Sequence, residues 1–276
     1  MYKNNNNKFH TKKSFGQNFL YDEDILSDII SFANVSKDDF VLEIGPGKGT
    51  LTKLLSNNCK KILAIELDND LISFLNSTFV NTNVTILHKD FLKTTDEELL
   101  DIFKSMSYQN ENIKVVANIP YNITSLIINK LLSSKLINEI TLLVQKEVAD
   151  RICAKDDTHD YGILTLAVKY YADAIPGFIV DKKYFRPIPK VDSKVIKIIK
   201  HPVPFDEDFT KKFFKTIKAA FSKRRKTLAN SLSSSAANIT KEQIEDCLSK
   251  LNINTMARPE DLSIDNYFSL TKMLYP

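Results

Sequence analysis

The sequence has no tryptophan and only six glycines, three cysteines and four histidines among its 276 residues. Cys59, Cys153 and Cys247 lie far apart and form no CxxC pair. The sequence therefore argues against a disulfide framework and predicts reduced thiols in a cytosolic protein. The histidines are scattered in the same way, so we expect no metal site.

Long apolar runs are also missing. No stretch reaches the roughly 18 apolar residues of a transmembrane helix, so we expect no membrane partner. The first residues, MYKNNNNKFHTKK, are polar and basic, which argues against a secretory signal. The asparagine run is low in complexity, and we expect residues 1–11 to be disordered. These features predict a cytoplasmic protein, and since no interface motif is found we expect a monomer.

Charge is nearly balanced over the whole chain, with 38 Lys and Arg and 34 Asp and Glu, but it is unevenly distributed. Residues 182–230 contain 15 Lys and Arg and four Asp and Glu, which leaves 23 and 30 for the remainder. A mildly acidic body with one strongly basic segment predicts a surface that binds a polyanion. The alternative is a solvated surface in a lysine-rich protein.

Short apolar runs alternate with amphipathic stretches between residues 40 and 145. The sequence predicts strands at 40–44, 61–65, 84–88, 113–117 and 140–144. Strands that alternate with helices indicate βαβ units and a parallel sheet covered on both faces. Two later runs, 174–181 and 193–201, predict strands that pair like a hairpin at the edge of this sheet.

The pattern becomes entirely helical in the last part of the chain. Helices are predicted at 207–221, 224–235, 240–250 and 264–274. Pro202 and Pro204 mark a linker before them. The sequence therefore predicts an α/β catalytic domain at residues 1–204 and a small all-helical domain at residues 205–276.

Three of the six glycines fall within five residues, in EIGPGKG. Gly45, Gly47 and Gly49 follow the first predicted strand, at the sheet edge where open α/β sheets bind ligands. Their spacing differs from the dinucleotide fingerprint GxGxxG, and no phosphate-loop GK[ST] follows. Glu43 beside this turn would repel pyrophosphate but favours a cationic cofactor. S-adenosylmethionine, a sulfonium without phosphates, is such a cofactor.

The following strands end in residues suited to the same cofactor. Glu66 follows Gly45 by 21 residues, a spacing at which a carboxylate can accept hydrogen bonds from ribose hydroxyls. Asp90 can accept from the adenine amine, and Phe91 can pack on the adenine ring. Taken singly, Glu66 also fits a helix cap and Asp90 a turn residue. Their position at successive strand ends, completed by Asn118, predicts one cofactor crevice.

The fourth strand ends in NIPY, which offers a way to activate an adenine amine. This amine is a poor nucleophile because its lone pair is delocalised into the ring. The Asn118 side-chain oxygen and the Ile119 carbonyl can accept from its N–H groups and localise the lone pair. Pro120 stiffens the turn. Tyr121 offers a stacking face for the unstacked base, worth about 1–3 kcal/mol.

Two further segments bear on a nucleic-acid substrate. Phe185, in FRPIPKVDS, either closes the other face of the base or is a core residue between strands. Residues 211–230 carry eight basic residues and no acid, which predicts contacts to phosphates that bind RNA by backbone and shape. The densest run consists of Lys223, Arg224, Arg225 and Lys226.

Taken together, these motifs resemble the family of ribosomal RNA small-subunit adenine N6-dimethyltransferases (KsgA type), from about residue 12 to 275. The resemblance is carried by KKSFGQNFL, VLEIGPGKGTLT, IELD, KDF, NIPYNIT, LLVQKEVADRI, FRPIPKVDS, FSKRRKTLANSL and RPEDLS. It implies a Rossmann-like S-adenosylmethionine-dependent methyltransferase fold with a C-terminal helical domain. It also implies that Asn18 and Leu20 close over the cofactor. Leu126, where the family often has proline, is a small departure.

The substrate implied by the resemblance is a pair of adjacent adenosines in the 3′-terminal hairpin of 16S rRNA. Each would receive two methyl groups, in an immature 30S subunit during ribosome biogenesis. One alternative is the erythromycin-resistance branch, which methylates large-subunit rRNA and shares NIPY, although FSKRRKTLANSL and RPEDLS look like the small-subunit branch. Another is a non-catalytic rRNA-binding assembly factor. The intact cofactor motifs favour the enzyme.

Overall fold

The computed structural model describes residues 18–203, 205–223, 225–235 and 239–275. The described chain divides into two compact units. The first runs up to residue 146 and resumes at 177–197, and the second comprises 147–176 and the residues from 198 onward. This division differs from the predicted boundary after residue 204, because residues 147–176 contribute to the core of the C-terminal helices. The N-terminal residues 1–11, which we predicted to be disordered, lie outside the described residues.

A seven-stranded sheet has the strand order β4-β3-β2-β5-β6-β9-β7. Its strands are β2 Phe40–Ile44, β3 Lys61–Glu66, β4 Val84–His88, β5 Ile113–Asn118, β6 Glu139–Gln145, β7 Ala172–Val180 and β9 Ser193–Lys200. The strands from β2 to β6 pair in parallel. All seven predicted strands are confirmed within two residues, and β7 and β9 are neighbours at one edge, as expected.

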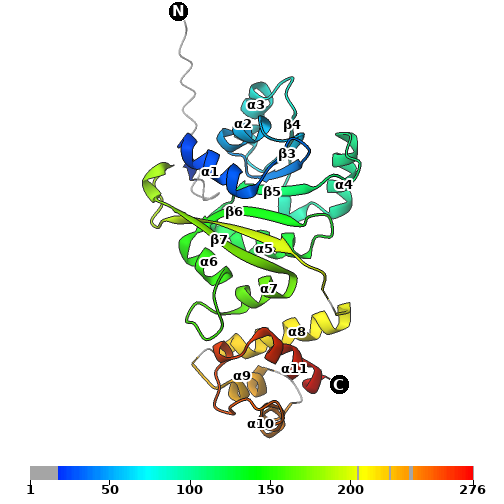
Figure 1. Ribbon diagram of the computed structural model, residues 1–276, viewed down its shortest axis with the longest axis vertical. Helices are drawn as coiled ribbons and strands as arrows, with labels where there is room; N and C mark the ends of the chain where they lie inside the picture. The colour runs from blue at the N-terminus through cyan, green and yellow to red at the C-terminus, as the bar shows by residue number, and fades with distance from the viewer. Residues whose placement is uncertain (1–17, 204, 224, 236–238, 276) are drawn as a thin grey trace, which may run out of the picture. The chain divides into compact units, whose positions relative to one another are not determined.

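Helices cover both faces of the parallel strands. In the first unit they are α1 Glu23–Ala33, α2 Thr50–Ser56, α3 Asn69–Thr78, α4 Asp96–Ser105 and α5 Thr124–Ser133. In Figure 1, α1, α2 and α3 lie on one side of the sheet and α5 on the other. Local signals fix their starts: the Asp22 carboxylate caps α1, and Thr95 and Glu98 form a capping box at α4.

The strand order alone predicts where a ligand crevice lies in this sheet. Strand β2 has β3 on one side and β5 on the other. The strand order therefore reverses at β2, and in open α/β sheets ligands bind at the carboxyl ends of the strands beside such a reversal. The glycine turn follows β2 directly, and NIPY begins at the last residue of β5.

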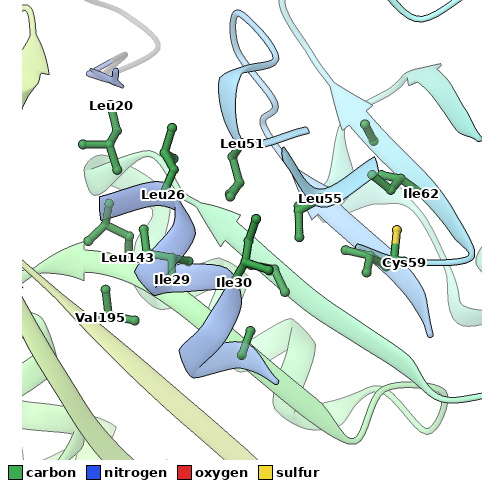
Figure 2. Packing of buried hydrophobic residues seen from close by; sticks show 14 of the residues in the cluster. Leu20, Leu26, Ile29, Ile30, Leu51, Leu55, Cys59, Ile62, Leu143 and Val195 are labelled. Atoms are coloured by element: carbon green, nitrogen blue, oxygen red, sulfur yellow. The ribbon is translucent and has the colours of Figure 1, made fainter. Parts of the chain in front are cut away.

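A second, two-stranded antiparallel sheet was not predicted. It joins β1, Phe19–Leu20, to β8, Phe185–Arg186, with Leu20 opposite Phe185 and Phe19 opposite Arg186. Leu20 and Phe185 are buried in the main core of the first unit, together with residues such as Leu26, which Figure 2 shows near Leu20. The sequence left Phe185 open between a base-stacking and a core role, and the structure makes it a core residue.

The second unit is built from helices around its own core. They are α6 Lys146–Ile152, α7 Ile163–Tyr171, α8 Glu207–Ala220, α9 Leu228–Ser235, α10 Lys241–Lys250 and α11 Ile264–Leu274. Tyr170 of α7 stacks on Phe213 of α8, with ring centroids 4.7 Å apart. This packing explains why residues 147–176 belong with the C-terminal helices. The four C-terminal helices are confirmed, although α9 starts four residues later than predicted.

Candidate active site

A cavity of about 300 Å³ lies at the carboxyl ends of β2, β3, β4 and β5. Its wall includes every residue predicted for catalysis or cofactor binding except Phe185: Asn18, Leu20, Gly45, Gly47, Glu66, Asp90, Phe91, Asn118, Ile119, Pro120 and Tyr121. Phe185 is fully buried on the core side of β8. The structure thus gathers residues that are a hundred positions apart in the chain around one space large enough for a small-molecule ligand.

The glycine turn brings the backbone close to this cavity. Gly45, Gly47 and Gly49 have φ values of 68°, 57° and 73°, which side chains with a Cβ rarely adopt. At Gly47 a Cβ atom would also lie 2.7 Å from a ring carbon of Phe19. Only glycine therefore allows the turn and the N-terminal strand to approach each other here.

The Glu66 carboxylate is held by three backbone N–H groups. Its Oε2 atom accepts from Gly47 at 3.1 Å, and its Oε1 atom accepts from Leu67 and Asp68 at 2.8 Å each. Burial raises the pKa of Glu66, and these hydrogen bonds oppose the rise. Glu66 thus holds the turn before α3 and at the same time fixes the glycine turn at the cavity wall. The N-cap of α3 itself is Asp68, so the helix-cap alternative considered for Glu66 is wrong.

Asp90 and Phe91 occupy the wall at the end of β4. The Asp90 Oδ1 atom accepts from the Leu92 N–H at 2.9 Å, so one carboxylate oxygen serves the turn. Phe91 is buried, with the Lys130 ammonium 5.5 Å from its ring centroid. Asp90 is therefore a turn residue, which was one of the two roles predicted from the sequence. Because it also lines the cavity, it can contact a cofactor there as well.

Glu43 places a buried polar atom in the cavity wall. Its side chain is 2% exposed, and within the described residues its Oε2 atom has no hydrogen-bond partner. The pKa of Glu43 is raised to about 8, mainly by burial; the Thr52 hydroxyl opposes the rise and the Glu66 carboxylate adds to it. Such a buried, unpaired acid costs stability unless it meets a donor or a positive charge.

NIPY presents its acceptors to the cavity. The Asn118 Nδ2 atom donates to the Asn18 backbone carbonyl at 3.1 Å, so Oδ1 is the atom left to accept from a ligand. Ile119 is buried and Pro120 has φ −60°, within the range that proline imposes. The Thr124 hydroxyl lies within 3.2 Å of the carbonyls of residues 120 and 121. The turn is therefore fixed at both ends.

Two further hydroxyl contacts at the site were not predicted from the sequence. Tyr121 Oη and Ser193 Oγ are 2.7 Å apart, and the Thr50 hydroxyl donates to the Leu20 carbonyl at 3.0 Å. Burial raises the pKa of Tyr121, so it stays a neutral phenol. Ser193 stands in the motif FRPIPKVDS, which is the only signal that could have pointed to it.

The predicted RNA contacts lie in the second unit, between α8 and α9. Lys223, Arg225 and Lys226 are exposed, and Arg224 lies outside the described residues. A separate hollow of about 760 Å³ follows α8 and is lined by residues including Lys211, Lys215 and Lys218. The spacing of these lysines on the helix thus places them along one depression.

Two other kinds of site are absent from the part of the chain that the structure describes. Its ranges contain no cluster of three or more His, Cys, Asp and Glu that could hold a metal ion. They also contain no helix with the length and apolar character needed to cross a membrane.

Comparison with known proteins agrees with the geometry. Residues 8–275 match the family model described as ribosomal RNA adenine dimethylase. The chain belongs to this family. The match spans both units, and the methyl donor of the family is S-adenosylmethionine.

Several relatives in this family are similar over almost their whole length. Proteins named ribosomal RNA small subunit methyltransferase A from Anoxybacillus flavithermus and Clostridium botulinum (strain Langeland) are each 42% identical. The first match covers 97% of this chain and 92% of the relative, and the second 98% and 96%. A solved dimethyladenosine transferase from Plasmodium falciparum has a TM-score of 0.71 at 27% identity, covering 91% of this chain and 95% of that one.

The solved 23S rRNA methyltransferase ErmE shares the fold. Its TM-score is 0.69 at 24% identity, covering 94% of this chain and all of that chain. The curated relatives from bacteria, at about 40% identity, bear the name of the small-subunit branch.

The cavity residues of this chain fit a sulfonium nucleoside. Glu43 offers a buried carboxyl oxygen that has no hydrogen-bond partner among the described residues, and the Gly47 backbone approaches the cavity where a larger residue would clash. Glu66 and Asp90 supply carboxylates, and Phe91 an apolar ring. These groups would hold the amino-acid tail, ribose and adenine of S-adenosylmethionine without needing a phosphate-binding element.

Proposed function

We propose that this protein dimethylates the N6 amines of two adjacent adenosines in the 3′-terminal hairpin of small-subunit rRNA. The observation that carries this proposal is the shared cavity: NIPY lies beside the glycine turn, Glu66 and Asp90 at one sheet edge. Relatives named for the small-subunit rRNA support the choice of substrate.

The chain's own part in the reaction is to bind and shape the amine. S-adenosylmethionine supplies an electrophilic methyl group on a positively charged sulfur. The Asn118 Oδ1 atom and the Ile119 carbonyl accept from the two N–H groups of the adenine, which localises the lone pair on N6. Because the donor is already charged, the amine needs no strong base before transfer, and its proton can leave afterwards. Positioning then supplies most of the rate.

The second transfer places a stricter demand on the same groups. A monomethylated amine has one N–H left, so only one of the two acceptors can hold it. The other acceptor must tolerate a methyl group beside it. The planar Tyr121 ring can hold the base in place during both transfers because stacking does not depend on the substituent at N6.

The second unit supplies the contacts to the RNA backbone in this proposal. Lys223, Arg224, Arg225 and Lys226 contact phosphates of the rRNA, which positions the substrate without reading its sequence. We further propose that the partner is the immature 30S subunit, and that the protein acts as a monomer in the cytoplasm.

The test is to incubate the purified protein with labelled S-adenosylmethionine and immature small or large ribosomal subunits. The proposal predicts label on N6 of adenosine in small-subunit rRNA, at two adjacent positions. Label in large-subunit rRNA would support the erythromycin-resistance alternative. Binding to small subunits without any transfer would support an assembly factor.

A further inference from the structure

The β1–β8 sheet has two chemically different faces. Residues opposite each other in an antiparallel pair share a face, and successive residues alternate between faces. Leu20 and Phe185 form the buried face, at 2% and 0% exposure. Phe19 and its partner Arg186 therefore lie on the opposite face, and Tyr21 continues that face along the chain.

Rings and cations are paired along this outer face. The Arg186 guanidinium lies 5.1 Å from the ring centroid of Tyr21, and the Lys48 ammonium lies 5.2 Å from that of Phe19. Tyr21 is 47% exposed, and its hydroxyl donates to the Lys183 carbonyl at 3.0 Å. An exposed aromatic ring with a cation over one face is the type of platform on which nucleobases stack.

The outer face begins at the rim of the catalytic cavity. Asn18, Phe19 and Leu20 line that cavity with Tyr121, and Tyr21 is the next residue in the chain. The segment 182–190 continues the face with four basic residues and no acid. Its lysines 182, 183 and 190 are exposed.

Acidic residues limit this surface on two sides. Asp22, Glu23 and Asp24 begin α1 directly after Tyr21, and the Asp22 carboxylate is engaged as the helix cap. Asp181 lies 3.5 Å from the Lys183 ammonium. A polyanion on the outer face is therefore confined to the Arg186 side, away from the start of α1.

We propose that Tyr21 and Arg186 bind the nucleotides that flank the target adenosine, with Tyr21 stacking on a neighbouring base and Arg186 contacting phosphate. The proposal rests on the function proposed above and names the surface that receives the rest of the strand. An adenosine that enters the cavity leaves its stack, and its neighbours lose stacking partners as well. A ring at the cavity rim replaces one of these partners. A role limited to closing the cofactor cavity would need Phe19 and Leu20 but not Tyr21 or Arg186.

The experiment compares Tyr21→Ala with Tyr21→Phe, and Arg186→Ala with Arg186→Lys, in the full-length protein. We expect Tyr21→Ala to raise the KM for immature small subunits about tenfold, whereas Tyr21→Phe, which keeps the ring, stays within about twofold. Arg186→Ala should weaken small-subunit binding and reduce the slope of log K against log salt by about one, with Arg186→Lys keeping that slope. Calorimetric binding of S-adenosylmethionine should be unchanged in all four variants.

The outcomes separate this proposal from the one it rests on. An active wild type with the same KM for small subunits in Tyr21→Ala and Arg186→Ala overturns the flanking-nucleotide surface alone. A loss of cofactor affinity in these variants without a change in small-subunit binding also overturns it, because the outer face would then only close the cavity. A wild type that transfers no methyl group to small subunits overturns both proposals.

Discussion

The Asn118 amide has its orientation set by a residue one hundred positions earlier. Its Nδ2 atom donates to the Asn18 carbonyl at 3.1 Å, so Oδ1 is the atom available to an incoming amine. Without this contact the amide could present its nitrogen, which is a donor and would repel the N–H groups of adenine. The N-terminal strand therefore influences the chemistry of NIPY as well as closing the cavity.

The hydrogen bond between Tyr121 and Ser193 can be tested by measuring the free energy of unfolding of variants. Ser193→Ala removes the partner of a half-buried phenol, and we expect it to lower the free energy of unfolding by about 1–3 kcal/mol. Tyr121→Phe leaves the fully buried Ser193 hydroxyl unpaired at a similar cost. The double variant should lose clearly less than the sum, because both unpaired groups are gone. Strictly additive losses in urea titrations would show that the 2.7 Å contact contributes nothing.

Glu43 makes stability depend on pH. Its pKa is about 8 in the folded protein against an ordinary value of 4.5, so the folded state keeps a proton that the unfolded chain releases. The contribution of Glu43 to the free energy of unfolding is therefore largest at low pH. It falls as pH rises from about 5 to 8, by a few kcal/mol at most. The buried Glu66, whose pKa is also raised, acts in the same direction.

The matching measurement compares Glu43→Gln with the wild type by equilibrium unfolding at pH 5, 6, 7 and 8. The variant should lose less stability than the wild type across this range, because glutamine does not ionise. Glu97→Gln, at an exposed position on α4, serves as the control and should follow the wild-type profile. Parallel profiles for Glu43→Gln and the wild type would mean that Glu43 is ionised throughout.

At the scale of elements, the glycine turn and β1 depend on each other. Gly47→Ala introduces a Cβ at φ 57° and within 2.7 Å of the Phe19 ring, so we expect it to displace the N-terminal strand and to weaken S-adenosylmethionine binding about tenfold or more. Gly162→Ala is the matched control, since nothing lies within 4 Å of a Cβ there. Equal cofactor affinities of the two variants in calorimetry would contradict this role of Gly47.

The elements that the sequence predicts well are those with a strong local signal. The parallel strands are short apolar runs between helices, and the C-terminal helices have a clear period, so their positions follow from the sequence alone. The spacing of EIGPGKG, Glu66, Asp90 and NIPY also places these residues at one edge, because parallel strands end on the same side.

Other features depend on contacts that no local pattern encodes. The two-residue strands β1 and β8 are too short for periodicity, and they join residues 19 and 186. The Tyr121–Ser193 contact spans 72 positions, and the Thr50–Leu20 contact spans 30. Residues 147–176 join the second unit through packing such as Tyr170 on Phe213, which the sequence does not reveal.

At the scale of the whole molecule, basic charge is concentrated in one stretch of the sequence that contributes to both units. Replacing Lys223, Arg225 and Lys226 together by alanine removes three exposed cations from the second unit. We expect weaker binding of immature small subunits, a salt slope reduced by up to about three, and unchanged cofactor affinity. The double variant Lys241→Ala, Lys250→Ala, at exposed positions paired with Glu245 and Asp246, is the control. If the triple variant and the control weakened small-subunit binding equally, the three cations would act only through the net charge of the protein.

The most direct test of the account is the methylation rate of Asn118→Ala on immature small subunits at saturating S-adenosylmethionine. The variant loses one of the two acceptors that localise the N6 lone pair, and we expect the rate to fall about a hundredfold or more, as when a single aligned group is removed from other active sites. Small-subunit binding should stay within about twofold of the wild type. Transfer at the wild-type rate would contradict the assignment of NIPY as the group that activates the adenine amine.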